Sequence, residues 1–299
     1  MDMSAFPTTT TAVRGFTQTF THINAGGRGR QSPLLLVHGW PETRRIWWRM
    51  LQPLADAGYE VICPDLRGFG DSDVSPDGIH DVPMHSRDLH ALCTELGHER
   101  VVVVGGDLGG PVIQDMALRF PGYVSKMVLF NSPLPYDAER MAGMRTRSAR
   151  ESTDYYLRQG TDADALAAEL ATPEARRRYI ATFYTSRFWA HPGAFTRDEV
   201  DFHTEPFADA AKLRASFGAY ESAFDEGKRS EASVMAINDV TPTMLLFGPS
   251  DHVIYPDFDR MAAAVFAARV GPFLLRDCGH FVQWEAADVL VSAITAWVS

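Results

Sequence analysis

The sequence contains few cysteines, no excess of basic residues and no long hydrophobic run. Three cysteines among 299 residues (Cys63, Cys93 and Cys278) cannot all pair, so we expect reduced thiols, no disulfide framework and a cytoplasmic location. Their spacing is not that of a zinc site. A formal net charge of −10 argues against a nucleic-acid partner and against binding to an anionic membrane surface. No stretch approaches the roughly 18 apolar residues of a membrane span.

The N-terminal region lacks the features of a targeting segment. Residues 1–11 are polar and threonine-rich, with neither a basic start nor an apolar core, so we expect no secretory signal. We predict a flexible tail over residues 1–15. The sequence G-G-R-G at 26–29 predicts a flexible turn.

Short apolar strands alternate with amphipathic helices at both ends of the chain, which is typical of βαβ units and favours an α/β fold with a doubly wound, mostly parallel sheet. Residues 132–238 break the pattern, because they suggest helices and no buried strand. The sequence therefore predicts one α/β core, made of 16–131 and 239–299, with a helical cap inserted at 132–238. The predicted strands are 16–23, 34–37, 59–63, 101–104, 126–130, 244–247 and 272–275, and the predicted core helices are 46–57, 84–96, 109–120, 258–268 and 282–298.

A glycine-rich segment at 105–110 lies between a predicted strand and a predicted helix. It reads G-G-D-L-G-G, which becomes the G-x-S-x-G nucleophile elbow if Asp107 is replaced by serine. Gly105 and Gly109 suit a tight turn in which side chains would collide, and the start of a helix favours an anion. Taken alone, the segment fits a glycine loop with Asp107 as a helix cap equally well. Its spacing differs from the dinucleotide-binding G-x-G-x-x-G.

Two further residues follow the last two predicted strands. Asp251 follows the first of them and His280 the second, so both lie with Asp107 at the carboxyl edge of the sheet, where open α/β sheets bind ligands. The order nucleophile, acid, histidine is that of α/β-hydrolases. We therefore expect Asp107, Asp251 and His280 to form a catalytic triad. His38 is expected instead to hold its own loop by hydrogen bonds.

Together these motifs resemble those of the α/β-hydrolase fold family and, within it, the α/β epoxide hydrolases. Residues 38–41 match the H-G-x-P loop, 65–72 the D-x-R-G-x-G-x-S turn, and 105–110 the elbow with an aspartate nucleophile. Residues 248–251 and 279–280 match the acid and histidine loops. The resemblance implies the α/β-hydrolase fold with a helical cap, a small apolar epoxide as substrate, and no metal or organic cofactor.

An aspartate nucleophile restricts the chemistry. No G-x-S-x-G occurs in the sequence, so the serine esterase mechanism has no nucleophile. A carboxylate that attacks a saturated carbon forms a stable ester, so the substrate is an epoxide or a haloalkane. His280, held by Asp251, would then activate water to hydrolyse the Asp107 ester. The family pattern implies that the backbone N–H groups of Trp40 and Leu108 hold the oxyanion.

Epoxide opening produces an alkoxide that needs a proton, which tyrosine can donate because its ordinary pKa is near 10. The resemblance implies two cap tyrosines. Tyr220 matches the second by position, although Ala219 and Glu221 replace its usual neighbours, and either Tyr155 or Tyr156 matches the first, with Tyr155 favoured. Five apolar residues are candidates for a pocket lining but are explained at least as well as cap core: Met141, Met144, Phe183, Trp189 and Phe195.

Two other functions stay open. The first is a haloalkane dehalogenase, which needs N–H donors to bind the halide. That family usually has Trp directly after the nucleophile, where this chain has Leu108. Trp40 would supply a single indole donor. A hydrolase-fold binding protein without catalysis would not need the complete triad. The sequence does not specify the natural substrate, the stereochemistry or the oligomeric state, a homodimer included.

Overall fold

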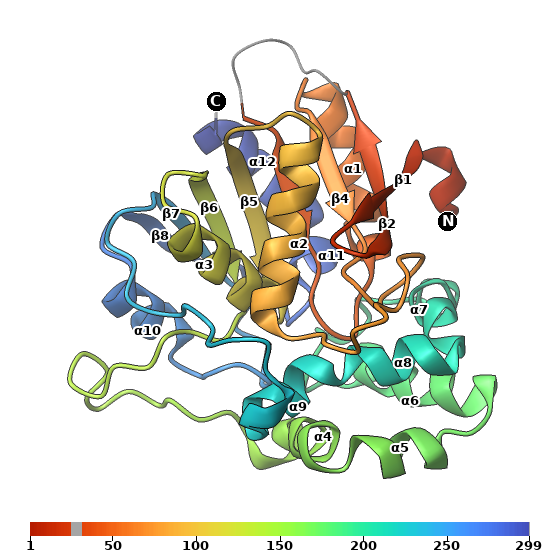
Figure 1. Ribbon diagram of the computed structural model, residues 1–299. Helices are drawn as coiled ribbons and strands as arrows, with labels where there is room; N and C mark the ends of the chain where they lie inside the picture. The colour runs from red at the N-terminus through yellow and green to blue at the C-terminus, as the bar shows by residue number, and fades with distance from the viewer. Residues whose placement is uncertain (25–31, 299) are drawn as a thin grey trace.

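The computed structural model describes residues 1–24 and 32–298, and its centre is an eight-stranded sheet (Figure 1). The strand order is β1-β2-β4-β3-β5-β6-β7-β8. β2 is antiparallel to both β1 and β4, and the remaining pairs are parallel, so the predicted mostly parallel sheet is confirmed. The strands are Thr8–Val13 (β1), Phe16–Ile23 (β2), Leu34–Val37 (β3), Val61–Pro64 (β4), Val101–Gly106 (β5), Val124–Phe130 (β6), Thr243–Phe247 (β7) and Arg269–Leu274 (β8).

Helices cover both faces of this sheet (Figure 1). α2 (Val82–Glu95) packs beside α3 (Gly109–Arg119) on one face, and α1 (Trp48–Asp56) packs beside α12 (Ala287–Val298) on the other. Every residue of β3, β4 and β5 is buried, because a parallel sheet covered on both faces has no solvent side. This is why these strands appear in the sequence as continuous apolar runs without alternation.

Residues 132–238, all of them described, form helices and no β-strand. These helices lie together beside the carboxyl ends of the parallel strands (Figure 1). They are α4 (Arg150–Thr161), α5 (Ala163–Glu169), α6 (Pro173–Thr185), α7 (Arg197–Thr204), α8 (Ala210–Ser216) and α9 (Gly218–Phe224), with short 3-10 helices at Glu205–Ala208 and Glu226–Lys228. None of the described helices has the length and apolar character needed to cross a bilayer.

The N-terminal region differs from the prediction. Instead of a flexible tail over 1–15, a 3-10 helix forms at Met3–Ala5, and β1 pairs with β2 along its whole length. The threonine run suits an edge strand because β-branched side chains favour the extended backbone. Its exposed side chains left no apolar pattern from which the strand could be predicted. The predicted turn at 26–29 lies outside the described residues.

The two C-terminal helices also differ from the predicted boundaries. The single helix expected over 282–298 divides into α11 (Val282–Glu285) and α12, because Ala286 leaves the helical conformation with φ of −130°. α10 (Phe258–Val265) ends before residue 268, and β8 begins at residue 269 instead of 272. In the turn into β8, Phe266 is buried without being helical, while Ala267 is exposed.

Candidate active site

Asp107 occupies a tight turn between β5 and α3. Its φ of 45° lies in the left-handed region, which residues other than glycine rarely adopt. A Cβ on Gly109 would collide with the carbonyl oxygen of Val37, and a Cβ on Gly105 would come within 3.2 Å of that atom. The two glycines therefore let the turn lie against β3, for the steric reason expected from the sequence.

His280 lies between the two carboxylates expected as its partners. Its Nδ1 is 2.8 Å from Asp251 Oδ2, and its Nε2 is 3.2 Å from Asp107 Oδ2. His280 follows β8, Asp251 follows β7 and Asp107 follows β5. All three residues are almost completely buried. Burial lowers the pKa of His280, but the charges of Asp251 and Asp107 outweigh it and hold the pKa well above its usual value. The structure thus brings together all three residues of the predicted triad.

Asn131, which directly follows β6, holds the Asp251 carboxylate and was not singled out from the sequence. Its Nδ2 donates to Asp251 Oδ2 at 2.8 Å, while its Oδ1 accepts from the Gly248 N–H at 2.9 Å. The N–H groups of Val253 and Ile254 donate to Asp251 Oδ1 at 2.6 and 3.1 Å. Asp251 is therefore fixed by hydrogen bonds on both oxygens. The sequence feature that could have identified Asn131 is its position as a polar residue directly after a buried strand.

The loop after β3 approaches Asp107 closely. The Trp40 N–H donates to Asp107 Oδ1 at 2.6 Å. A Cβ on Gly39 would lie 2.5 Å from the Asp107 Cβ, so only glycine permits this approach. Leu108 has helical backbone angles at the start of α3, where the first N–H groups have no partner within the helix. Of the two expected backbone donors, the Trp40 N–H contacts the Asp107 side chain, and the Leu108 N–H lies at the start of α3 next to it in the chain.

His38 holds this loop, as expected from the sequence. The Leu66 N–H donates to His38 Nε2 at 3.0 Å, so Nδ1 carries the proton and donates to the Gly39 carbonyl at 2.8 Å. Burial lowers the pKa of His38, which keeps the imidazole neutral in this role.

A buried carboxyl group, Glu42, lies behind the same loop and was not predicted. It accepts hydrogen bonds from the Gly39 N–H at 2.6 Å and from Gln283 Nε2 at 2.7 Å. Burial and the negative charge of Asp107 raise the pKa of Glu42 to about 7. The sequence feature that could have identified Glu42 is an acidic residue one position after the H-G-x-P loop. With this pKa the Glu42 carboxyl group gains or loses its charge near neutral pH, and that charge interacts with the charge of Asp107.

Tyr155 on α4 and Tyr220 on α9 lie together above the Trp40 loop. The Tyr155 ring stacks on the Trp40 indole with centroids 5.3 Å apart, and the Tyr220 ring meets that indole edge-on at 5.6 Å. Burial and the charge of Asp107 raise the pKa of Tyr155 well above its usual value. Burial, Tyr155 and Asp107 do the same for Tyr220, so both hydroxyls keep their protons at neutral pH.

Tyr156 has a different environment from its neighbour. Its ring contacts Tyr220 and Phe224, at centroid distances of 5.3 and 4.9 Å. Burial raises its pKa without any contribution from Asp107. Of these two tyrosines of α4, Tyr155 is therefore the one whose pKa responds to the charge of Asp107.

A cavity of about 630 Å³ opens beside Asp107. The five apolar residues proposed as its lining do not appear among the described residues that line it. The rings of Phe183 and Trp189 pack around Trp40 instead, at centroid distances of 4.8 and 6.2 Å, and Phe195 stacks on Trp284 at 5.7 Å. Met141 is buried and Met144 packs against the same core, so these residues contribute to packing and do not line the cavity. The actual lining includes Asp107, Leu108, Tyr155, Tyr156, Tyr220, Glu231, Met235, Val253 and Tyr255.

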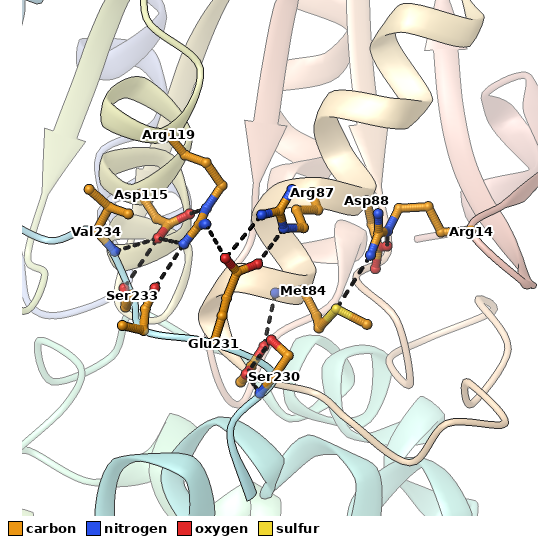
Figure 2. Close-up of polar contacts among 12 residues, drawn as sticks. Arg14, Met84, Arg87, Asp88, Asp115, Arg119, Ser230, Glu231, Ser233 and Val234 are labelled. Carbon is orange, nitrogen blue, oxygen red and sulfur yellow. Dashed lines mark hydrogen bonds and ion pairs between the residues drawn. The ribbon is translucent and has the colours of Figure 1, made fainter. Parts of the chain in front are cut away.

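Ion pairs fix one wall of this cavity to the core (Figure 2). Glu231, on the segment that returns from α9 to β7, pairs with Arg87 of α2 and, at 2.6 Å, with Arg119 of α3. Asp115 of α3 binds Arg119 at 2.7 Å and accepts from the Val234 N–H at the same distance. The returning segment is therefore held against two core helices where it passes the cavity.

The chain belongs to the α/β-hydrolase fold family, whose model matches residues 32–287. It is 38% identical over 235 residues to the AB hydrolase superfamily protein YfhM of Bacillus subtilis, with 78% of each chain covered. It is 26% identical to an epoxide hydrolase of Caballeronia sordidicola, over 89% of this chain and 86% of the relative. A solved structure of the epoxide hydrolase CorEH superimposes with a TM-score of 0.81 at 20% identity, covering 98% of both chains. The resemblance to epoxide hydrolases is thereby confirmed.

Proposed function

We propose that this protein hydrolyses an apolar epoxide to a vicinal diol through an ester on Asp107. The observation that carries the proposal is that two buried, protonated tyrosines line the same cavity as a carboxylate that a histidine–aspartate pair contacts. That set supplies a nucleophile, proton donors and a water-activating base, as epoxide hydrolysis requires. The relatives that carry the name epoxide hydrolase support it.

In the first step Asp107 Oδ2 attacks one epoxide carbon. The Trp40 N–H holds Oδ1, which leaves Oδ2 as the attacking oxygen. A bond forms between Oδ2 and carbon, the carbon–oxygen bond of the ring breaks, and its electron pair remains on the epoxide oxygen. Tyr155 or Tyr220 donates a proton to that oxygen, so no free alkoxide forms. The product is an alkyl ester of Asp107 with a neighbouring hydroxyl group.

In the second step His280 activates water. Formation of the ester removes the charge of Asp107, which is one of the two charges that hold the pKa of His280 high. The pKa of His280 therefore falls only once the ester exists, and the imidazole becomes a base at the right moment. The proton that His280 gives up at this point restores the tyrosine that acted as acid. Water then attacks the carbonyl carbon of the ester and gives a proton to His280, while the N–H groups of Trp40 and Leu108 stabilise the oxyanion. The bond between the carbonyl carbon and the diol oxygen breaks, that oxygen takes the proton from His280, and the proton left on the Asp107 carboxyl returns to His280 as the diol leaves.

We further propose that residues 132–238 act as a cap domain on a core of 16–131 and 239–299. α4 and α9 pack on each other and supply the two tyrosines from the side of the cavity opposite the β5 turn. A Cβ on Gly160 of α4 would collide with the Phe224 ring of α9, so this glycine permits their close packing. The cap thus contributes the acid and the core contributes the nucleophile and the base.

Dehalogenation would require halide donors that the site does not offer. The Trp40 indole N–H donates to Ser216 Oγ at 3.1 Å, and the Leu108 side chain has no donor. We therefore expect the purified protein to convert styrene oxide to its diol and to release little halide from 1-chlorobutane. Chromatography of the diol and a halide assay on the same preparation measure both. Halide release without diol formation would overturn the proposal.

The neighbouring tyrosines provide a matched pair of variants. Tyr155→Phe removes a hydroxyl that we propose donates a proton to the epoxide oxygen, so kcat should fall roughly 10²-fold. The kcat of Tyr156→Phe should stay within about threefold of wild type. Tyr220→Phe should resemble Tyr155→Phe. Steady-state kinetics on styrene oxide measure the effect, and melting temperatures close to wild type show that each variant folds. A loss in Tyr156→Phe equal to that in Tyr155→Phe would contradict the assignment.

A further inference from the structure

A second cluster of polar side chains lies at the end of the sheet opposite Asp107. It consists of His22 near the end of β2, Glu60 immediately before β4, and His98 in the connection from α2 to β5. Glu60 and His98 precede parallel strands, whereas Asp107 follows one. The cluster is thus at the amino ends of these strands, away from α4 to α9 (Figure 1), and the proposed reaction makes no use of it.

The three side chains converge on one point. His22 Nε2 lies 2.8 Å and His98 Nε2 lies 3.0 Å from the same oxygen, Glu60 Oε1. All three donor atoms lie within 4.8 Å of one another. Ligand atoms of a tetrahedral zinc ion with bonds of 2.0–2.1 Å are about 3.3 Å apart. The two nitrogen–oxygen separations fall a few tenths of an ångström short of this spacing, and the two nitrogens lie within 4.8 Å of each other, so modest side-chain movement would admit the ion.

The backbone around the cluster is firmly held, so the donors are already placed. The Glu60 carbonyl accepts from the Leu34 N–H at 2.8 Å, and the His98 carbonyl accepts from the Tyr123 hydroxyl at 3.0 Å. The Glu60 side chain is only 7% exposed, while those of His22 and His98 are 13% and 17% exposed. The carboxylate therefore lies beneath two imidazoles that reach solvent, which gives an ion both a buried ligand and a route of entry.

We propose that His22, Glu60 and His98 bind a divalent transition metal, of which Zn²⁺ is the representative to test. Two imidazole nitrogens and one carboxylate suit zinc better than magnesium or calcium, which prefer oxygen ligands. In the free protein each imidazole donates its Nε2 proton to Glu60. On binding, that proton leaves Nε2, which coordinates the ion, and the imidazole is protonated on Nδ1, so two metal–nitrogen bonds replace the two hydrogen bonds to Glu60. Water completes the coordination. The ion joins three separate chain segments and acts on stability, not on catalysis.

Zinc binding is tested on full-length protein stripped with chelator and titrated with ZnCl₂. We expect one ion per chain by calorimetry, and a rise in melting temperature of about 4 °C at a zinc concentration of ~100 times Kd. The rise should be reversed by EDTA. Co²⁺ in place of Zn²⁺ should give visible absorption bands of a low-coordinate site.

His98→Gln and Glu60→Gln should weaken zinc binding by at least about tenfold, because each removes a metal ligand but keeps a polar side chain of similar reach. His90→Gln, a histidine outside the cluster, is the matched control and should bind zinc like wild type. Zinc-induced stabilisation lost in the two cluster variants and kept in the control supports the site. Wild-type protein that neither binds nor gains stability overturns it, and so does equal binding in all variants, which would place the ion elsewhere.

Discussion

Asp107→Ala should abolish epoxide turnover, with kcat reduced by at least about 10⁴-fold. Alanine has no group that can form the ester, and the remaining residues of the site have no second carboxylate in its position. Asp251 cannot substitute, because its two oxygens are held by Asn131, His280 and backbone N–H groups. Diol formation at high protein concentration measures the residual rate.

The control for this variant must separate chemistry from backbone strain. Alanine tolerates the φ of 45° at position 107 less well than aspartate does, so some stability is lost as well. Asp277 has the same residue type, a φ of 56° and an exposed side chain. Asp277→Ala should therefore show a similar loss of melting temperature with wild-type activity. Diol formation by folded Asp107→Ala would remove Asp107 as the nucleophile.

His280→Gln should stop the reaction halfway and leave substrate attached to Asp107. Attack by the carboxylate does not need the imidazole as a base, whereas hydrolysis of the ester does. We expect the intact-protein mass to increase by one substrate molecule per chain after exposure to styrene oxide. Peptide mapping should place the increase on the segment that contains Asp107.

The double variant Asp107→Ala/His280→Gln is the control for labelling elsewhere, and its mass should not change. An unmodified His280→Gln protein, tested under conditions in which wild type forms diol, would count against a two-step reaction. The wild-type protein offers the same test through pH. As pH falls, His280 in the ester intermediate becomes protonated while the attack by Asp107 continues, so rapidly quenched samples should contain more ester at lower pH.

The central sheet could be predicted because its buried strands consist almost entirely of apolar residues. The segments at 34–37 and 101–104 are continuous apolar runs, and each lies within a strand of the structure. β1 could not be predicted, because a polar edge strand depends on its hydrogen-bonded partner β2 and not on a buried face. The division of the last helix at Ala286 likewise follows from tertiary packing and has no proline or glycine to mark it.

The site shows the same contrast. Asp107, Asp251 and His280 could be chosen from the sequence because each lies in the loop that follows a strand, and the topology brings such loops to one edge of the sheet. Asn131 and Glu42 occupy comparable positions but carry no motif, and only their hydrogen bonds to the Asp251 and Gly39 loops show what they hold. Position along the chain thus located the three residues that we propose react, but not the residues that orient them.

The sequence by itself determined the α/β core, the place of the helical insertion and the three positions, 107, 251 and 280, that meet at one edge of the sheet, because strand order and short loops leave few ways to arrange them. Only the tertiary structure decided which tyrosine of residues 132–238 responds to the charge of Asp107. Neighbouring residues on a helix point about 100° apart, so the choice between Tyr155 and Tyr156 depends on how α4 packs against α9 and Trp40. The tertiary structure also brings His22, Glu60 and His98 together in one cluster. The sequence could not show this, because 38 residues separate each histidine from the glutamate and no local pattern connects them.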